Sequence, residues 1–216
     1  MGHTIMNSFK GIIFDLDGVL LSTDRFHYLA WKALADRLGI PFDEKKNDLL
    51  RGVSRMDSLE IVLGERSGEF LPEEKIALAT EKNDIYRSYL QTLTPDFVSL
   101  EVFDTLRKLK DSGLKLAVGS SSKNTPLILE RTDLRSFFDA VSDGNNITKS
   151  KPDPEVFLMA AEFIGLEPSE CAVVEDADSG IEAAKRGGFY AISIGEAITN
   201  NLDDRHIDSL KELLEG

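Results

Sequence analysis

The sequence predicts an α/β protein in which a doubly wound parallel sheet is interrupted by an inserted, wholly helical segment. Short apolar runs such as Gly11–Phe14 and Cys171–Val174 are too brief for helices, and amphipathic segments of helical periodicity separate them. Such runs are typical of strands that are buried on both faces of a parallel sheet. The insertion is indicated by residues 23–93, where helical patterns follow one another without an intervening strand.

The elements of the sheet part can be assigned in chain order. Apolar runs predict strands at 11–14, 114–118, 140–142, 171–174 and 190–194. Apolar residues at helical spacing predict helices over about 102–109, 156–164 and 181–185, and each pattern runs out at or just before a glycine. Alternation of strand and helix favours a Rossmann-like core with helices on both faces of the sheet.

The inserted segment has its own helical stripes. Apolar residues share one face over 26–38, and further helical patterns cover 56–64 and 73–90. We therefore predict two domains: an α/β core formed by residues 1–22 and 94–216, and a helical cap formed by residues 23–93.

Composition excludes several classes of partner. The 216 residues include 25 basic and 38 acidic side chains, for a net charge of −13, which repels nucleic acids and anionic membrane surfaces. A phosphorylated metabolite is repelled as well, so an anion site must be built locally from metal, lysine and backbone N–H groups. The single cysteine excludes an internal disulfide, and no apolar stretch is long enough to span a membrane. We expect a soluble, cytoplasmic protein.

Two carboxylates, Asp15 and Asp17, directly follow the first predicted strand. They lie at the carboxyl edge of the sheet, where open α/β folds bind ligands. The spacing suits a nucleophile paired with a general acid/base, and Gly18 allows a sharp turn beside them. The alternative is a turn with helix-capping aspartates, which the motif alone does not exclude.

Three further polar segments belong to the same predicted edge. Small hydroxyl side chains and N–H groups at 120–124 suit a phosphate group, although a plain polar loop would look alike. Lys151 precedes a helix, where it is either a phosphate ligand or a solvated lysine. Glu175 and Asp176 follow the fourth strand, and with Asp15 they would form an oxygen-rich Mg²⁺ site rather than a helix cap. Capping does not explain all four segments together.

These segments resemble the haloacid-dehalogenase-like superfamily of phosphotransferases. The similarity rests on FDLDGV, SSSKN, KSKPDP and VEDADSG, in this order along the chain. Within the superfamily the helical insertion is similar to that of the β-phosphoglucomutases, through STDRFHYLAW, LRGVSRMDSL and EKND. Arg51 stands where close relatives have lysine, and Val98-Ser99-Leu100 replaces a common proline–glycine turn.

The resemblance implies roles for individual residues. Asp15 would become the aspartyl phosphate and Asp17 would be the general acid/base. The implied Mg²⁺ ligands are Asp15, the backbone carbonyl of Asp17, Glu175 and Asp176. The implied phosphoryl-binding residues of the core are Ser120, Ser121, Ser122, Lys123, Asn124 and Lys151. The implied substrate-binding residues of the cap are Thr23, His27, Trp31, Gly52, Val53, Ser54, Arg55 and Lys82.

The expected function is that of a phosphomutase acting as a monomer on a small phosphorylated sugar. It would interconvert β-D-glucose 1-phosphate and glucose 6-phosphate through a bisphosphate intermediate. The main alternative is a Mg²⁺-dependent sugar-phosphate phosphatase of the same architecture. A phospho-accepting receiver module is disfavoured because the cap would cover its phosphorylated face, and paired aspartates fit phosphoryl transfer better than dehalogenation. For the cap residues His27 and Trp31, packing is an alternative to binding.

Overall fold

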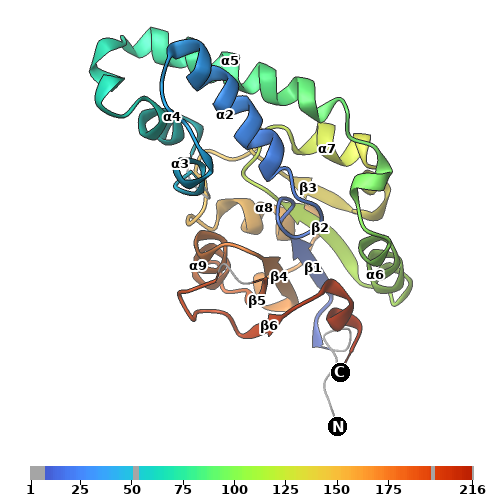
Figure 1. The fold of residues 1–216 in the computed structure, drawn as a ribbon. Helices are drawn as coiled ribbons and strands as arrows, with labels where there is room; N and C mark the ends of the chain where they lie inside the picture. The colour runs from blue at the N-terminus through green and yellow to red at the C-terminus, as the bar shows by residue number, and fades with distance from the viewer. Residues whose placement is uncertain (1–7, 51–53, 196–197, 216) are drawn as a thin grey trace. The chain divides into compact units, whose positions relative to one another are not determined.

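The computed structural model describes residues 8–50, 54–195 and 198–215 (Figure 1). It divides the chain into two compact units. The sheet unit combines Met1–Ser22 with Leu93–Gly216, and the helical unit comprises Thr23–Thr92.

The sheet unit contains a six-stranded, all-parallel sheet with the order β3-β2-β1-β4-β5-β6. Its strands are β1 Gly11–Phe14, β2 Lys115–Gly119, β3 Ala140–Ser142, β4 Cys171–Glu175, β5 Tyr190–Ile194 and β6 Arg205–Ile207. The order reverses between β1 and β4, which is the switch point at which open α/β sheets bind ligands. The predicted α/β class with a doubly wound core is confirmed.

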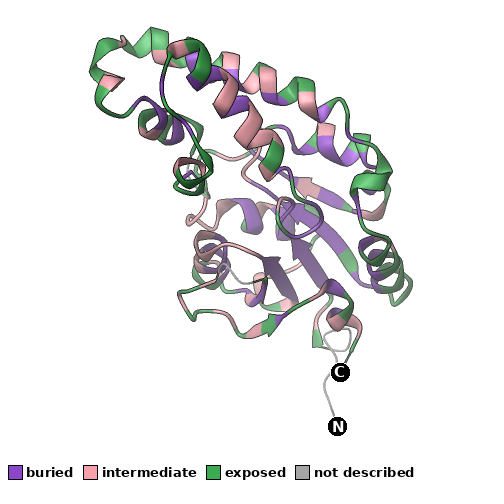
Figure 2. Cartoon of the chain, in the orientation of Figure 1, coloured by how far each residue is buried: buried purple, intermediate pink, exposed green. Residues whose placement is uncertain are grey.

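Apolar side chains on both faces of the sheet bury its central strands in the interior of the sheet unit. Ile13 of β1 pairs with Ala117 of β2 on one side and with Val173 of β4 on the other. All three side chains are fully buried, and Figure 2 shows the central strands in the colour of buried residues. Strand β6 was not expected from the sequence, because its three residues include the polar pair Arg205 and His206.

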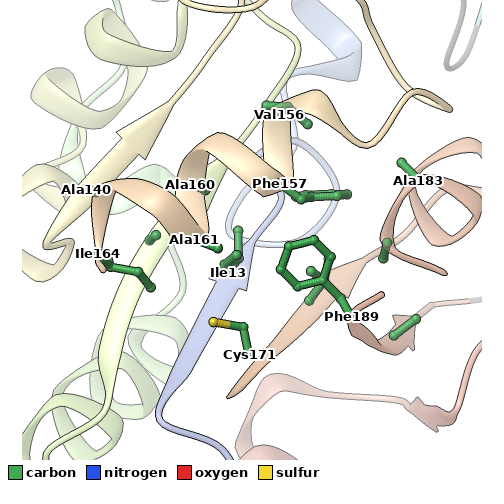
Figure 3. Packing of buried hydrophobic residues seen from close by; sticks show 14 of the residues in the cluster. Ile13, Ala140, Val156, Phe157, Ala160, Ala161, Ile164, Cys171, Ala183 and Phe189 are labelled. Carbon is green, nitrogen blue, oxygen red and sulfur yellow. The ribbon is translucent and has the colours of Figure 1, made fainter. Parts of the chain in front are cut away.

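The helices of the sheet unit are α6 Leu100–Asp111, α7 Thr125–Arg131, α8 Glu155–Phe163 and α9 Asp178–Arg186. Helices α8 and α9 bury their apolar faces against one side of the sheet (Figure 3). Phe157 of α8 meets Phe189 edge-on, with 6.3 Å between ring centroids, above Ile13 and Cys171. Short 3₁₀ turns complete the unit: η2 Pro95–Phe97, η3 Leu134–Phe137, η4 Pro168–Glu170 and η5 Leu210–Leu214.

The helical unit contains α2 Asp24–Leu38, α3 Glu44–Asp48, α4 Arg55–Leu63, the 3₁₀ turn η1 Gly64–Glu69 and α5 Pro72–Leu90. Helices α2 and α5 contact each other along their lengths. Their shared core includes Leu34, Leu59 and Leu78, so this unit has an apolar interior of its own. Helix α3 was not predicted from the sequence, because it is only five residues long and buries none of them.

The segment that re-enters the sheet unit begins at Leu93. Within the segment Val98-Ser99-Leu100, the Ser99 side chain accepts a hydrogen bond from Val102 N–H at 3.3 Å. Val98 is buried beside it. Ser99 therefore caps and starts helix α6.

Candidate active site

Three carboxyl groups converge where β1 and β4 end. One oxygen each of Asp15, Glu175 and Asp176 lies within 4.8 Å of the others. Asp15 directly follows β1, and its N–H donates to the carbonyl of Val174 in β4 at 2.9 Å. Asp15 and Glu175 are buried and Asp176 is half-buried. Such a cluster supplies the carboxylate oxygens that Mg²⁺ prefers, so the residues present fit a divalent cation.

Two glycines make room for this carboxylate cluster. Gly18 has a φ of +91°, and a Cβ at this position would lie 1.9 Å from Oδ2 of Asp176. Gly180, in the first turn of α9, approaches the other carboxylate, because a Cβ there would lie 2.0 Å from Cδ of Glu175. Side chains at either position would push a carboxylate away, so the backbone itself shapes the cluster.

Lys151 joins two of the carboxylates. Its Nζ donates to Oδ1 of Asp15 and, at 3.3 Å, to Oε2 of Glu175, and it lies 4.6 Å from the ring centroid of Phe157. Burial lowers the pKa of Lys151, but the charges of Asp15 and Glu175 outweigh it and leave that pKa raised. Lys151 therefore stays protonated in this buried position, where it can hold an anion against Asp15.

Glu175 is a fully enclosed carboxyl group with a perturbed pKa. Burial raises its pKa well above the ordinary value, and the nearby charge of Asp15 raises it further. Lys151 acts in the opposite direction. The excess of acidic groups over the single lysine is the electrostatic situation that a bound cation relieves.

Asp17 lies on the closed turn that follows β1. The N–H of Gly18 donates to the carbonyl of Leu21 at 2.8 Å, and Asp17 and Leu21 form a parallel bridge. These bonds hold Asp17 two residues after Asp15, half-buried on the same loop.

The predicted phosphate loop follows β2 and is bonded to itself. Ser120 Oγ accepts from Ser122 N–H at 3.3 Å, and Ser122 Oγ accepts from Asn124 N–H at 3.2 Å. Ser120 and Asn124 are buried, whereas Lys123 is exposed. Among the described residues, Ser121 Oγ is a buried hydroxyl without a hydrogen-bond partner. The phosphoryl contacts of this loop stay predictions.

In the helical unit, Lys82 of α5 meets His27 of α2. Lys82 Nζ lies 2.9 Å from His27 Nδ1, and its side chain is only 3% exposed. Burial, and next the charge of Arg55, lower the pKa of Lys82 to about 7. Burial and the charges of Lys82 and Arg55 also hold the pKa of His27 well below its usual range. His27 is therefore neutral, and when Lys82 is protonated its ammonium group donates to Nδ1, which leaves the ring proton on Nε2.

Arg55 begins helix α4 and is exposed. Its charge lowers the pKa of both His27 and Lys82, so the three basic groups influence one another within the helical unit. Ser54 caps the same helix: its Oγ accepts from Asp57 N–H at 3.3 Å and donates to Asp57 Oδ2 at 2.6 Å. Arg51 and the predicted site residues Gly52 and Val53 lie outside the described residues.

Two aromatic rings lie close to the Lys82 ammonium group. The centroids of the Trp31 and Tyr86 rings each lie 4.8 Å from Nζ. Trp31 also belongs to the apolar core of the unit, and Thr23 is buried at its first residue. Tyr86 was not among the residues predicted from the sequence, although its position four residues after Lys82 places both on the same face of the helix.

Comparison with known proteins places this geometry in context. The model of the haloacid dehalogenase-like hydrolases matches residues 9–188. The chain is 40% identical to β-phosphoglucomutase of Bacillus subtilis, over 87% of this chain and 84% of that protein. It is 30% identical to a fructose-1-phosphate phosphatase of Escherichia coli, over 86% of this chain and 96% of that one.

A solved structure agrees with the sequence comparison. The crystal structure of β-phosphoglucomutase from Clostridium difficile matches with a TM-score of 0.87 and 34% identity, covering 95% of this chain and 93% of that one. Separately, none of the helices in the described residues has the length and apolar content needed to cross a membrane.

Proposed function

The chain belongs to the haloacid dehalogenase-like hydrolases, and we propose that it is a phosphomutase interconverting β-D-glucose 1-phosphate and glucose 6-phosphate. The observation that carries the proposal is the basic group formed by His27, Arg55 and Lys82 in the helical unit. In a chain with a net charge of −13, three basic side chains close together are best explained by binding of an anion. A second anion site is needed when the substrate carries a phosphate at either end, and a monophosphate hydrolase needs only one.

The chemistry begins at Asp15. Its carboxylate oxygen attacks the phosphorus atom, the bond from phosphorus to the sugar oxygen breaks, and Asp17 gives its proton to that oxygen. In the return step Asp17 takes the proton of the acceptor hydroxyl, whose oxygen attacks the aspartyl phosphate and restores free Asp15. Phosphoryl transfer needs positioning and charge neutralisation, and Lys151 beside Asp15 supports both.

Two such transfers make a mutase. An aspartyl phosphate passes its phosphoryl group to the 6-hydroxyl of β-glucose 1-phosphate, which forms the 1,6-bisphosphate. The bisphosphate then binds the other way round and returns its 1-phosphate to Asp15, leaving glucose 6-phosphate. The site of the basic group in the helical unit would hold whichever phosphate is not reacting.

We infer that the metal is Mg²⁺, held by Asp15, Glu175, Asp176 and the backbone carbonyl of Asp17. When bound it supplies positive charge that offsets the charge of the transferring phosphoryl group. We also expect the enzyme to act as a cytoplasmic monomer. Cys171 has no part in this chemistry, because burial raises the pKa of its thiol to about 11.

The competing function is hydrolysis of a small sugar phosphate, which the relative from Escherichia coli favours by its name. The mutase and phosphatase functions can be distinguished by incubating the protein with β-glucose 1-phosphate, Mg²⁺ and a trace of bisphosphate primer. Phosphate release and glucose 6-phosphate formation are then followed together. We expect glucose 6-phosphate with phosphate only as a slow side product. Stoichiometric phosphate with little isomerised sugar would reject the mutase and leave the phosphatase.

A further inference from the structure

Tyr86 of helix α5 has no role in the function proposed above, yet it contacts His27 and Lys82, which do, and also Thr23. Its ring stacks on the His27 ring with 4.1 Å between centroids and 26° between planes. The same ring lies 4.8 Å from Nζ of Lys82. Its hydroxyl is 2.9 Å from Oγ1 of Thr23, in a buried hydrogen bond between residues 63 positions apart. Tyr86 itself is 1% exposed.

The ring has an electrostatic effect on Lys82. The face of an aromatic ring is negative, so an ammonium group above it is stabilised, most strongly where water is excluded. The other groups that face Lys82 are His27 and Trp31 on α2 and Arg55 on α4, with Asp84 of α5 near Arg55. His27 is neutral and Arg55 repels the ammonium charge. The two rings, together with the hydrogen bond to His27 Nδ1, therefore oppose the cost of burying it.

The hydroxyl fixes the ring in place. Thr23 is the first residue of the helical unit, and its bond to Tyr86 joins the start of α2 to a position about one turn before the end of α5. A ring that stacks on His27 and underlies Lys82 can slide or tilt unless its far end is held. The Thr23 bond removes this freedom.

We propose that Tyr86 is a positioning residue for the pair formed by Lys82 and His27, with its ring stabilising the protonated form of Lys82 against the cost of burial and its hydroxyl anchoring the ring to Thr23. This inference depends on the proposed function only in one respect, namely that Lys82 and His27 bind the sugar phosphate. The electrostatic part concerns the free protein.

A fluorination series tests the ring without changing its shape. Phe, 4-fluoro-Phe, 3,5-difluoro-Phe and pentafluoro-Phe at position 86 progressively weaken the negative ring face. In the free protein, ¹³C-labelled lysine gives the titration midpoint of Lys82, with K82M identifying its resonance. We expect the midpoint to fall stepwise along the series, by about 0.5–1.5 pH units in total. The matched control is the same series at Tyr28, whose ring stacks on Phe42 in the same unit; it should leave the midpoint in place.

A double-mutant cycle tests the hydroxyl. Y86F and T23V should each raise KM for β-glucose 1-phosphate by about 2–10-fold, the worth of one hydrogen bond. The double variant should show no further loss, because both changes remove the same bond. Additive losses would contradict the anchoring role.

The outcomes separate this inference from the proposed function. A midpoint that does not move along the series at position 86, or moves equally with the series at Tyr28, overturns the role of the ring even if the enzyme is a mutase. Absence of turnover on sugar phosphates would reject the proposed function, while the lysine titration would still decide the role of the ring.

Discussion

Asp15 lies close to groups of both charges, the Lys151 ammonium and the carboxyl groups of Glu175 and Asp176. This setting allows an anionic phosphoryl group to approach a carboxylate that would repel it in water. The residue type alone does not provide this, because Asp143, also buried at the end of a strand, accepts hydrogen bonds from Asn145 instead.

We predict that D15N abolishes phosphoenzyme formation while the fold is kept, because an amide oxygen is a far weaker nucleophile than a carboxylate. Intact-mass spectrometry after incubation with the bisphosphate measures the phosphoenzyme, and circular dichroism checks the fold. D143N is the matched control and should still be phosphorylated. Turnover by D15N at a substantial fraction of the parent rate would show that the nucleophile is another residue.

For Asp17 we predict that D17N slows phosphoryl transfer in both directions by roughly 10²–10⁴, the usual worth of general acid–base catalysis. Mg²⁺ affinity should change little, because the expected ligand from this residue is its backbone carbonyl. Single-turnover kinetics and a calorimetric Mg²⁺ titration measure the two effects. Loss of metal binding with the transfer rate preserved at excess metal would reverse the assignment.

At the scale of elements, the site depends on how closely a turn and a helix start approach the ends of β1 and β4. Gly18 belongs to the turn after β1 and Gly180 to the first turn of α9, and each meets a carboxylate side chain from the β4 end. Neither glycine carries chemistry, so its contribution is the space it leaves.

We predict that G18A weakens Mg²⁺ binding by at least tenfold, because its Cβ would occupy the space of the Asp176 carboxylate. G188A is the matched control: Gly188 also has a positive φ, of +81°, but its Cβ would meet nothing within 4 Å. Both variants bear the backbone cost of a non-glycine residue at positive φ. Equal Mg²⁺ affinity in the two variants would mean that Gly18 does not shape the carboxylate cluster.

At the scale of the whole molecule, an acidic chain carries a buried lysine, Lys82, in the helical unit and a largely enclosed one, Lys151, in the sheet unit, and these two behave differently. Lys151 has two carboxylate partners and a raised pKa, whereas Lys82 has a neutral imidazole, two rings and a pKa lowered to about 7. Within the described part of the chain, Lys82 thus has no close anionic partner of the kind that a phosphorylated ligand would supply. Its burial costs stability in the free protein.

The pH dependence of stability follows from this cost. Between about pH 7 and 10.5 the unfolded chain binds a proton at Lys82 that the folded chain has lost, so the Lys82 contribution to stability rises with pH. We predict that K82M is more stable than the parent near pH 7, on the order of 1–3 kcal/mol, with the difference shrinking toward pH 10. Thermal unfolding of both proteins at several pH values measures it. A difference that is constant with pH would show that Lys82 titrates normally.

The local pattern of apolar residues in the sequence was sufficient to predict most of the sheet and most of the helices. Apolar runs gave the first five strands to within a residue or two, since a strand buried on both faces cannot be polar. Strand β6 could not be found in this way, because it is the edge strand of the sheet, pairs only with β5 and includes the polar residues Arg205 and His206. Helices α3 and α7 are too short to show a periodicity.

The chemistry of the site was visible in the sequence because Asp15 and Asp176 directly follow strands β1 and β4, Lys151 lies in the connection that follows β3, and parallel strands bring their carboxyl ends to one edge. Asp15, Lys151, Glu175 and Asp176 could therefore be grouped from their positions alone. Only the tertiary structure decided which groups touch: that Lys151 bonds Asp15 and Glu175, that glycines 18 and 180 shape the cluster, and that Tyr86 underlies Lys82 and stacks on His27. The physical reason is that burial and distance set charge interactions, and residues far apart in the chain acquire both only when it packs.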